Sequence, residues 1–210
     1  MKQIDILIER YPSLNVCKKD LEDAVNILIE SFKSGNKLLV CGNGGSASDS
    51  DHITGELMKG FEKMRPISDD LYNKLAKLSH EDADHLKSSL QVGLPTIPLT
   101  EHSGLMTAFS NDSSSDSVFA NQVLGYGKNN DVLFAISTSG NSKNVVLACE
   151  VAKALGLKVI GLTGEKESKI SGLADVTIKV PSIRTYQIQE YHLPVYHAIC
   201  LELEDYFFEK

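Results

Sequence analysis

The segment 131–164 constrains the fold more than any other part of this chain. It begins with a short, nearly continuous apolar run, which is typical of a strand buried on both faces. Apolar residues then recur at helical spacing as far as Leu155, Gly156 ends that helix, and a second apolar run covers 158–163. The pattern predicts a strand, a helix and a parallel strand joined by a right-handed crossover.

A hydroxyl-rich turn connects the first of these strands to the helix. Its residues are Ser137, Thr138, Ser139, Gly140, Asn141 and Ser142. The turn lies at a helix N-terminus, where free backbone N–H groups and the positive end of the helix dipole converge. A single serine there would be an ordinary N-cap. The density of small donors instead favours a site for a phosphate carried by a polyhydroxy compound.

A second turn, rich in glycine, follows a predicted strand at 37–42 and precedes a helix over 48–59. Its glycines formally match the G-x-G-x-x-G/A dinucleotide fingerprint, but no strand ends in an acidic residue about twenty positions later. A nucleoside-triphosphate loop would need G-K-[ST], which is absent from the sequence. We therefore predict no nucleotide cofactor, and expect the backbone of Asn43, Gly44 and Gly45 to approach a sugar.

The alternation of apolar runs and helical patterns predicts a single α/β domain over 1–210. Its strands are expected near 37–42, 95–100, 131–137, 158–163 and 176–181. Because they lack in–out alternation, they predict a five-stranded parallel sheet with helices on both faces, a three-layer sandwich. An N-terminal helical region over 1–35 precedes the sheet. An insertion at 68–92, with leucines among many charges, predicts a surface helix or helical hairpin.

The last helix, predicted over 186–208, is apolar almost all the way round in its middle. We expect another subunit to bury it, because a five-stranded sheet already covered on both faces leaves little room for it.

Composition excludes several classes of protein. A net charge of −7 and a pI near 5.4 give no reason to expect nucleic acid as a ligand. The four cysteines are scattered and lie mostly in apolar runs, which predicts buried thiols in a reducing compartment. The N-terminus shows no export signal and no apolar run approaches twenty residues, so we expect a cytoplasmic protein with no membrane partner.

Two helices carry the candidate chemistry. His52 and Glu56 are four residues apart and share one helix face. Gln189 and His197 lie two turns apart on the last helix, about 80° around its axis, whereas His192 diverges from His197 by about 140°.

Four segments closely resemble the phosphoheptose isomerases, a branch of the sugar isomerase (SIS) family. They are GNGGSASDSDHITGEL, the pair Asn111-Asp112 in TAFSND, ISTSGNS and IQEYHLPVYH. The resemblance implies isomerisation of sedoheptulose 7-phosphate to D-glycero-D-manno-heptose 7-phosphate through an enediol, for heptose in lipopolysaccharide or capsule. It also implies a homotetramer with active sites completed across subunit boundaries.

The resemblance assigns roles residue by residue. Glu56 and His197 correspond to the catalytic pair, and His52, Glu56, Gln189 and His197 to zinc ligands in members that carry the metal. The implied substrate contacts are Asn43, Gly44, Gly45, Glu56, Asn111, Asp112, Ser137, Thr138, Ser139, Ser142 and Gln189. The chemistry agrees, because an enediol mechanism needs a base near two adjacent carbons and a proton shuttle near their oxygens, and imidazole titrates near neutrality. Zinc would polarise the carbonyl.

The chain departs from the family pattern in three places. These are the insertion at 68–92, the replacement by Gly60 of an arginine that typically follows the catalytic glutamate by one turn, and Pro194, which predicts a kink between Gln189 and His197. His80 and His85 in the insertion diverge on a helix, so we interpret their acidic surroundings as a solvated face rather than a metal site.

Two other classes of function stay open at this point. One is a non-catalytic SIS protein, either a sugar-phosphate sensor or a protein-binding module resembling a replication regulator. The other is an isomerase of a different sugar phosphate. The pair Glu56 and His197 favours the isomerase, because a pure binder has no chemical reason to keep it.

Overall fold

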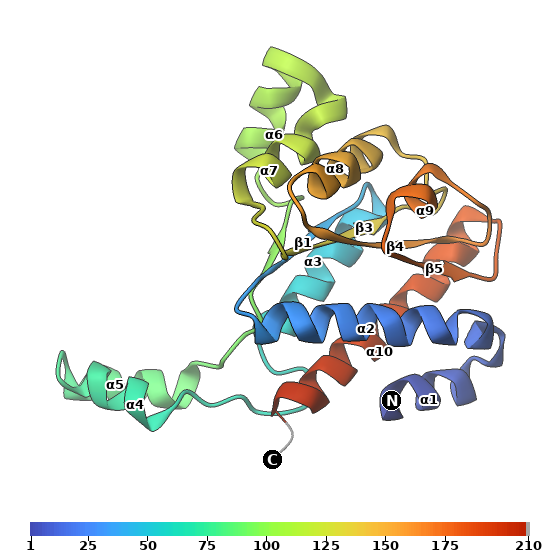
Figure 1. Cartoon of the computed structure of the whole chain (residues 1–210). Helices are drawn as coiled ribbons and strands as arrows, with labels where there is room; N and C mark the ends of the chain where they lie inside the picture. The colour runs from blue at the N-terminus through green and yellow to red at the C-terminus, as the bar shows by residue number, and fades with distance from the viewer. Residues whose placement is uncertain (209–210) are drawn as a thin grey trace.

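The computed structural model, which describes residues 1–208, contains a five-stranded parallel sheet between two layers of helices (Figure 1). The strands are β1 (Leu38–Cys41), β2 (Thr96–Pro98), β3 (Val132–Ile136), β4 (Lys158–Gly164) and β5 (Val176–Val180). Their order is β2-β1-β3-β4-β5, and every neighbouring pair is parallel. The predicted three-layer α/β sandwich is confirmed.

Alternate side chains of the central strand β3 enter two separate cores. Phe134 points into the layer of α1 (Lys2–Arg10), α2 (Lys18–Lys33), α3 (Gly45–Met58) and α10 (Thr185–Phe208). Leu133 and Ala135 point into the opposite layer, which contains α7 (Val118–Tyr126), α8 (Lys143–Ala154) and α9 (Lys169–Leu173). Both faces of the sheet are therefore buried by helices, which explains why its strands are continuous apolar runs.

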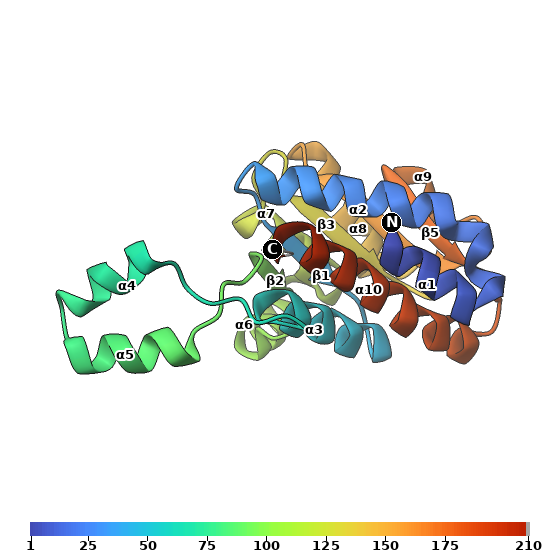
Figure 2. The ribbon, with the colours of Figure 1, turned by 90° about the horizontal axis from the view of Figure 1, so that it is seen from below.

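The helix α10 is buried mainly by its own chain, contrary to the reasoning from sequence that left no room for it. It packs against α1, α2 and α3 as well as the sheet (Figure 2). Val195 is 0% exposed and Ile199 3% exposed in the single chain. The N-terminal helices supply the missing cover, so the apolar middle of α10 does not by itself require a partner. Pro194 lies inside this helix, which continues on both sides of it.

The insertion forms a helical hairpin that extends away from the body of the molecule (Figures 1 and 2). Its helices are α4 (Asp69–Ala76) and α5 (His80–Ser89), and each begins at a serine whose hydroxyl accepts a backbone N–H. Ala83 is the only buried residue of the two helices. Nδ1 of His80 lies 3.6 Å from a carboxylate oxygen of Asp84, and both side chains are exposed. This part of the hairpin is therefore a solvated surface, as interpreted from the sequence.

Two smaller observations complete the fold. All four cysteines are buried and unpaired, and burial raises the pKa of the Cys149 thiol to about 12. Among residues 1–208, none of the helices combines the length and the apolar character that a membrane crossing needs.

Candidate active site

The two predicted turns meet at the carboxyl edge of the sheet. They follow β1 and β3, which are neighbouring parallel strands, so both turns emerge at the same edge. The side-chain amides of Asn43 and Asn144 join them by two reciprocal hydrogen bonds of 2.8 and 2.9 Å. Asn43, a predicted substrate contact, thereby also fixes the two turns to each other.

The hydroxyl-rich turn is a compact cluster of donors. The hydroxyl of Ser137 lies 3.0 Å from that of Ser142 and 3.5 Å from that of Ser139. Gly140 has φ of 64°, and its N–H donates to the carbonyl of Ser137, which closes the turn. A cavity of about 240 Å³ lies beside Thr138 and Ser139. An anion could therefore be held here by hydroxyl groups and backbone N–H groups.

Charged side chains from the loop after β4 also line this cavity. They are Glu165, Lys166 and Glu167. Lys166 provides a positive charge beside the hydroxyl groups, while the two carboxylates make the rest of the wall acidic.

The glycine turn brings α3 into direct contact with α10. Gly44 has φ of 56° and precedes the first residue of α3. A Cβ atom on Gly45 would lie 1.7 Å from Nε2 of Gln189, so a larger residue here would displace the Gln189 amide from this position. Gln189 therefore lies at the N-terminus of α3, beside the backbone that was predicted to contact the sugar.

Further along the same two helices, His52, Glu56 and His197 lie together. Nε2 of His52 is 3.3 Å from Oε1 of Glu56, and the rings of His52 and His197 have centroids 5.0 Å apart at 86°. The Glu56 side chain is 13% exposed, and its second oxygen lies 3.2 Å from the ammonium of Lys59. The predicted catalytic pair is thus assembled within one chain, on neighbouring helices.

The surroundings of His197 favour the neutral form of its imidazole. Burial lowers the pKa of His197, the nearby His52 and Arg10 lower it further, and Glu56 opposes them. Its Nε2 atom is buried and has no hydrogen-bond partner within residues 1–208. A buried nitrogen without a partner is available to a ligand or a proton.

Two further residues support His52, and sequence reasoning missed them. The hydroxyl of Tyr196 lies 2.9 Å from Nδ1 of His52 and 3.4 Å from Oδ1 of Asp49. Burial raises the pKa of Asp49 to about 6, although Tyr196 and His52 oppose this. The spacing of Asp49 and His52, one turn apart on α3, was the available signal. Nothing local indicated Tyr196, because it comes from the other helix.

The predicted zinc ligands are only partly gathered within the chain. Tyr196 donates to Asp49, so its oxygen can accept Nδ1–H of His52 and leave the lone pair of Nε2 facing Glu56. That donor pair and the unpartnered His197 suit a zinc ion chemically. Gln189 does not join these three side chains. It is eight residues from His197, about 12 Å along α10, and its amide lies against Gly45. Within 1–208 no group of three His, Cys, Asp or Glu side chains is arranged to hold a metal.

Asn111 and Asp112 lie apart from these groups. They are exposed on η2 (Ser110–Ser114), where the Asn111 amide donates to Asp112 at 2.8 Å. An ion pair of 2.6 Å between Asp116 and Lys143 brings this segment to the start of α8. Among the described hydrogen bonds, none links Asn111 or Asp112 to the hydroxyl-rich turn, so their predicted contact with substrate stays a prediction.

This combination of sheet, hydroxyl-rich turn and crossover helix is that of a SIS domain, and the model of the SIS domain family matches residues 13–89 and 80–164. The phosphoheptose isomerase of Crocosphaera subtropica is 40% identical over 190 residues, which cover 90% of this chain and 84% of the relative. That of Helicobacter pylori is 37% identical and covers 94% and 90%. The chain belongs to the phosphoheptose isomerase branch of the SIS family.

Solved structures support the same assignment. A phosphoheptose isomerase from Francisella tularensis matches with a TM-score of 0.74 at 28% identity, over 96% of this chain and 94% of that one. The corresponding enzyme from Neisseria gonorrhoeae matches with a TM-score of 0.69 at 29% identity, over 96% and 98%. The resemblance inferred from four short motifs is confirmed over nearly the whole chain.

Proposed function

We propose that this protein is an aldose–ketose isomerase that converts sedoheptulose 7-phosphate to D-glycero-D-manno-heptose 7-phosphate. The observation that carries the proposal is the meeting of Glu56 and His197 beside His52, in a chain whose relatives are phosphoheptose isomerases. A base and a neutral imidazole at one place are what this reaction class requires.

The reaction moves one proton between carbons and another between oxygens. Glu56 removes a proton from C1 of the ketose and returns it to C2, and the enediol lies between these two steps. His197 takes the O1 proton and delivers a proton to O2, which its neutral state allows. Lys59 lies 3.2 Å from Glu56 and offsets its charge.

The remaining predicted residues bind and orient the sugar. The hydroxyl-rich turn holds the phosphate, because its donors and helix N-terminus suit an anion. Gln189 and the backbone at Gly45 lie together at the N-terminus of α3 and are suited to bind sugar hydroxyl groups. Asn111 and Asp112 remain proposed contacts from the loop beside α8.

We also propose that the site binds zinc through His52, Glu56 and His197, which must draw closer together than they lie in the single chain, with Gln189 as a further ligand. When bound, the metal would polarise the substrate carbonyl. Because Gln189 and His197 of one chain diverge along α10, a shared site in a homotetramer would supply the fourth ligand from a neighbouring subunit. The family resemblance further supports a cytoplasmic reaction that provides heptose for lipopolysaccharide or capsule.

The proposed function is tested by incubating the pure protein with phosphorylated ketoses of five to seven carbons and following aldose formation. Preferential turnover of sedoheptulose 7-phosphate is expected, with the Glu56→Gln variant as the control for contaminating isomerases. Turnover of another sugar phosphate would change the substrate. Tight binding without turnover of any of them would show a sensor instead of an enzyme.

A further inference from the structure

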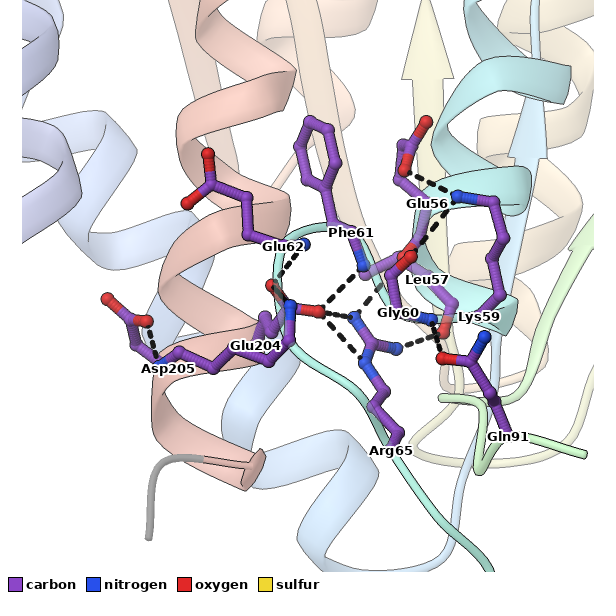
Figure 3. Close-up of polar contacts among 11 residues, drawn as sticks. Glu56, Leu57, Lys59, Gly60, Phe61, Glu62, Arg65, Gln91, Glu204 and Asp205 are labelled. Carbon is purple, nitrogen blue, oxygen red and sulfur yellow. Dashed lines mark hydrogen bonds and ion pairs between the residues drawn. The ribbon is translucent and has the colours of Figure 1, made fainter. Parts of the chain in front are cut away.

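A buried carboxylate on α10 organises the loop that follows the catalytic helix. Glu204 is 1% exposed, and its two oxygens accept the backbone N–H groups of Phe61 and Glu62 at 2.8 Å and of Lys63 at 3.2 Å (Figure 3). Burial acts to raise the pKa of Glu204, but these backbone donors and the Arg65 guanidinium outweigh it and lower that pKa. The loop is therefore wrapped around a charged carboxylate.

Arg65 connects the same carboxylate to the end of α3. Its Nε and Nη2 atoms donate to Oε1 of Glu204 at 3.0 and 2.8 Å. On its other side the guanidinium donates to the carbonyls of Leu57, at 2.8 Å, and Glu56, at 3.3 Å. These carbonyls belong to the last turn of α3, which ends at Met58, and such groups have no partner within a helix. Arg65 thus caps α3 at the turn that carries the Glu56 side chain.

The same arrangement reaches His197. Glu204 follows His197 by seven residues, which places both on nearly the same face of α10. Phe61, whose N–H is held by Glu204, has its ring 5.3 Å from the His197 ring at 68°. One carboxylate therefore fixes the backbone of Glu56 through Arg65, and a wall of the His197 site through Phe61.

A gain in stability does not by itself explain the buried ion pair of Arg65 and Glu204. Removing two charges from water is costly, and apolar residues of similar volume often serve as well or better in such positions. A planar guanidinium that bridges a carboxylate and two carbonyls, however, defines geometry more narrowly than apolar packing does.

We propose that Arg65 and Glu204 are positioning residues of the isomerase, which hold Glu56 on α3 at a set distance from His197 on α10. The proposal rests on the proposed function, because it concerns the placement of the two groups that transfer protons. Both side chains are buried, at 0% and 1% exposed, so we assign them a positioning role and not contact with the substrate. A misplacement of a catalytic group by about 1 Å can lower turnover about a hundredfold.

The test compares Arg65→Lys with Asp205→Asn. Lysine keeps a positive charge beside Glu204 but lacks the planar fork of five donors with which the guanidinium bonds the carboxylate and both carbonyls together. Asp205 is the neighbouring carboxylate, which pairs with Lys63 of the same loop but is not bonded to Arg65, Phe61 or the end of α3 in the described contacts. We expect kcat of Arg65→Lys to fall about tenfold or more with KM within about twofold, because orientation rather than binding is lost. Asp205→Asn should retain kcat.

Hydrogen exchange of the backbone amides provides a readout that does not depend on activity. Exchange in the last turn of α3 and at 61–63 should become faster in Arg65→Lys than in Asp205→Asn. Unchanged exchange, or faster exchange with wild-type kcat, would overturn the proposal. If the wild-type protein turned over no sugar phosphate, the proposed function would fail, and the positioning role of Arg65 and Glu204 would fail with it. If only the positioning role were wrong, the wild-type protein would still turn over its substrate, and Arg65→Lys would do so at the same rate.

Phe61→Leu provides a second route if Arg65→Lys does not fold. It keeps the ion pair and an apolar side chain but removes the aromatic contact with His197. The proposal expects a lower kcat at unchanged KM. Full turnover in a folded Phe61→Leu protein would overturn the part of the proposal that concerns His197.

Discussion

The hydroxyl group of Tyr196 bridges Nδ1 of His52 and the carboxylate of Asp49, at 2.9 and 3.4 Å. Because the hydroxyl donates to the carboxylate, its oxygen is free to accept a proton-bearing Nδ1. Tyr196 therefore holds the orientation of the His52 ring from the side opposite to Glu56. The direction in which Nε2 of His52 points therefore depends on Tyr196, a residue of the neighbouring helix α10.

Tyr196→Phe should lower kcat about tenfold, the lower end of the range for a residue that orients a ligand or catalytic group. It should also lower the free energy of unfolding by about 1 kcal/mol, because Asp49 loses its hydrogen bond in a buried place. Steady-state kinetics and urea unfolding measure both. Tyr191→Phe is the matched control, since among residues 1–208 its hydroxyl forms a hydrogen bond only with the exposed Ser13. Equal kinetics in the two variants would contradict the role of Tyr196.

Glu56→Gln and His197→Gln should each lower turnover at least about a hundredfold without unfolding the protein, the usual scale for a general acid or base. Coupled assays of aldose formation and circular dichroism would measure the two effects. His85→Gln, on the exposed hairpin, is the control for replacing a histidine and should retain full activity. A near-wild-type rate in either active-site variant would remove that residue from the mechanism.

Mixing the two inactive variants tests whether a site uses two subunits. Because Glu56 and His197 lie together in one chain, the mixture should stay inactive even when light scattering shows a tetramer, and recovered activity would show that each site takes these two side chains from different subunits. An active monomer would contradict the proposed assembly.

Protein purified without chelator should contain about one zinc ion per chain, and His52→Ala should lose it. The reason is that Nε2 of His52 and Oε1 of Glu56 are 3.3 Å apart and can face one cation. Elemental analysis measures metal content independently of activity. Gln189→Ala should retain part of the zinc if the other three ligands suffice. Full turnover after the metal has been removed would show that the reaction does not need it.

Ser139→Ala should raise KM about tenfold and leave kcat within about twofold, because the phosphate lies far from the reacting carbons. Ser34→Ala is a suitable control, since within residues 1–208 its hydroxyl donates only to the carbonyl of Glu30, in the helix α2 and outside the turn. A structure with substrate whose phosphate sits at Gly42–Ser46 would reverse the assignment of the two turns.

The contribution of His192 to the stability of the protein should fall as the pH drops from about 6.5 to 4. His192 is 0% exposed, and burial lowers its pKa to about 4. In this window the unfolded chain binds a proton that the folded chain excludes, so unfolding becomes easier as acid is added. The shift corresponds to about 3 kcal/mol. Asp49 acts in the opposite direction, because its raised pKa of about 6 adds stability as the pH falls toward 4.

His192→Leu isolates the histidine contribution, since Asp49 is present in both proteins. Urea unfolding at several pH values should show the wild type losing stability relative to the variant only below about pH 6.5. Parallel pH curves for the two proteins would contradict a neutral His192 in the folded state.

Short-range patterns in the sequence were enough to predict the elements of the fold. The strand at 131–137 follows from a continuous apolar run, and the helix that begins after Ser142 and the pair His52 and Glu56 follow from helical spacing, which a few neighbouring side chains determine. The hydroxyl-rich turn was recognisable for the same reason, because its donors are adjacent in the chain.

Only the tertiary structure decided which groups of α3 meet which groups of α10. Tyr196 bonds His52 across 144 residues, and Arg65 bonds Glu204 across 139. Such contacts depend on how two helices are aligned by everything packed around them, and no local periodicity encodes that alignment. The same holds for the apolar middle of α10, whose cover comes from α1 and α2 at the far end of the chain. Apolar periodicity indicates that a helix is buried, but chain topology determines what buries it.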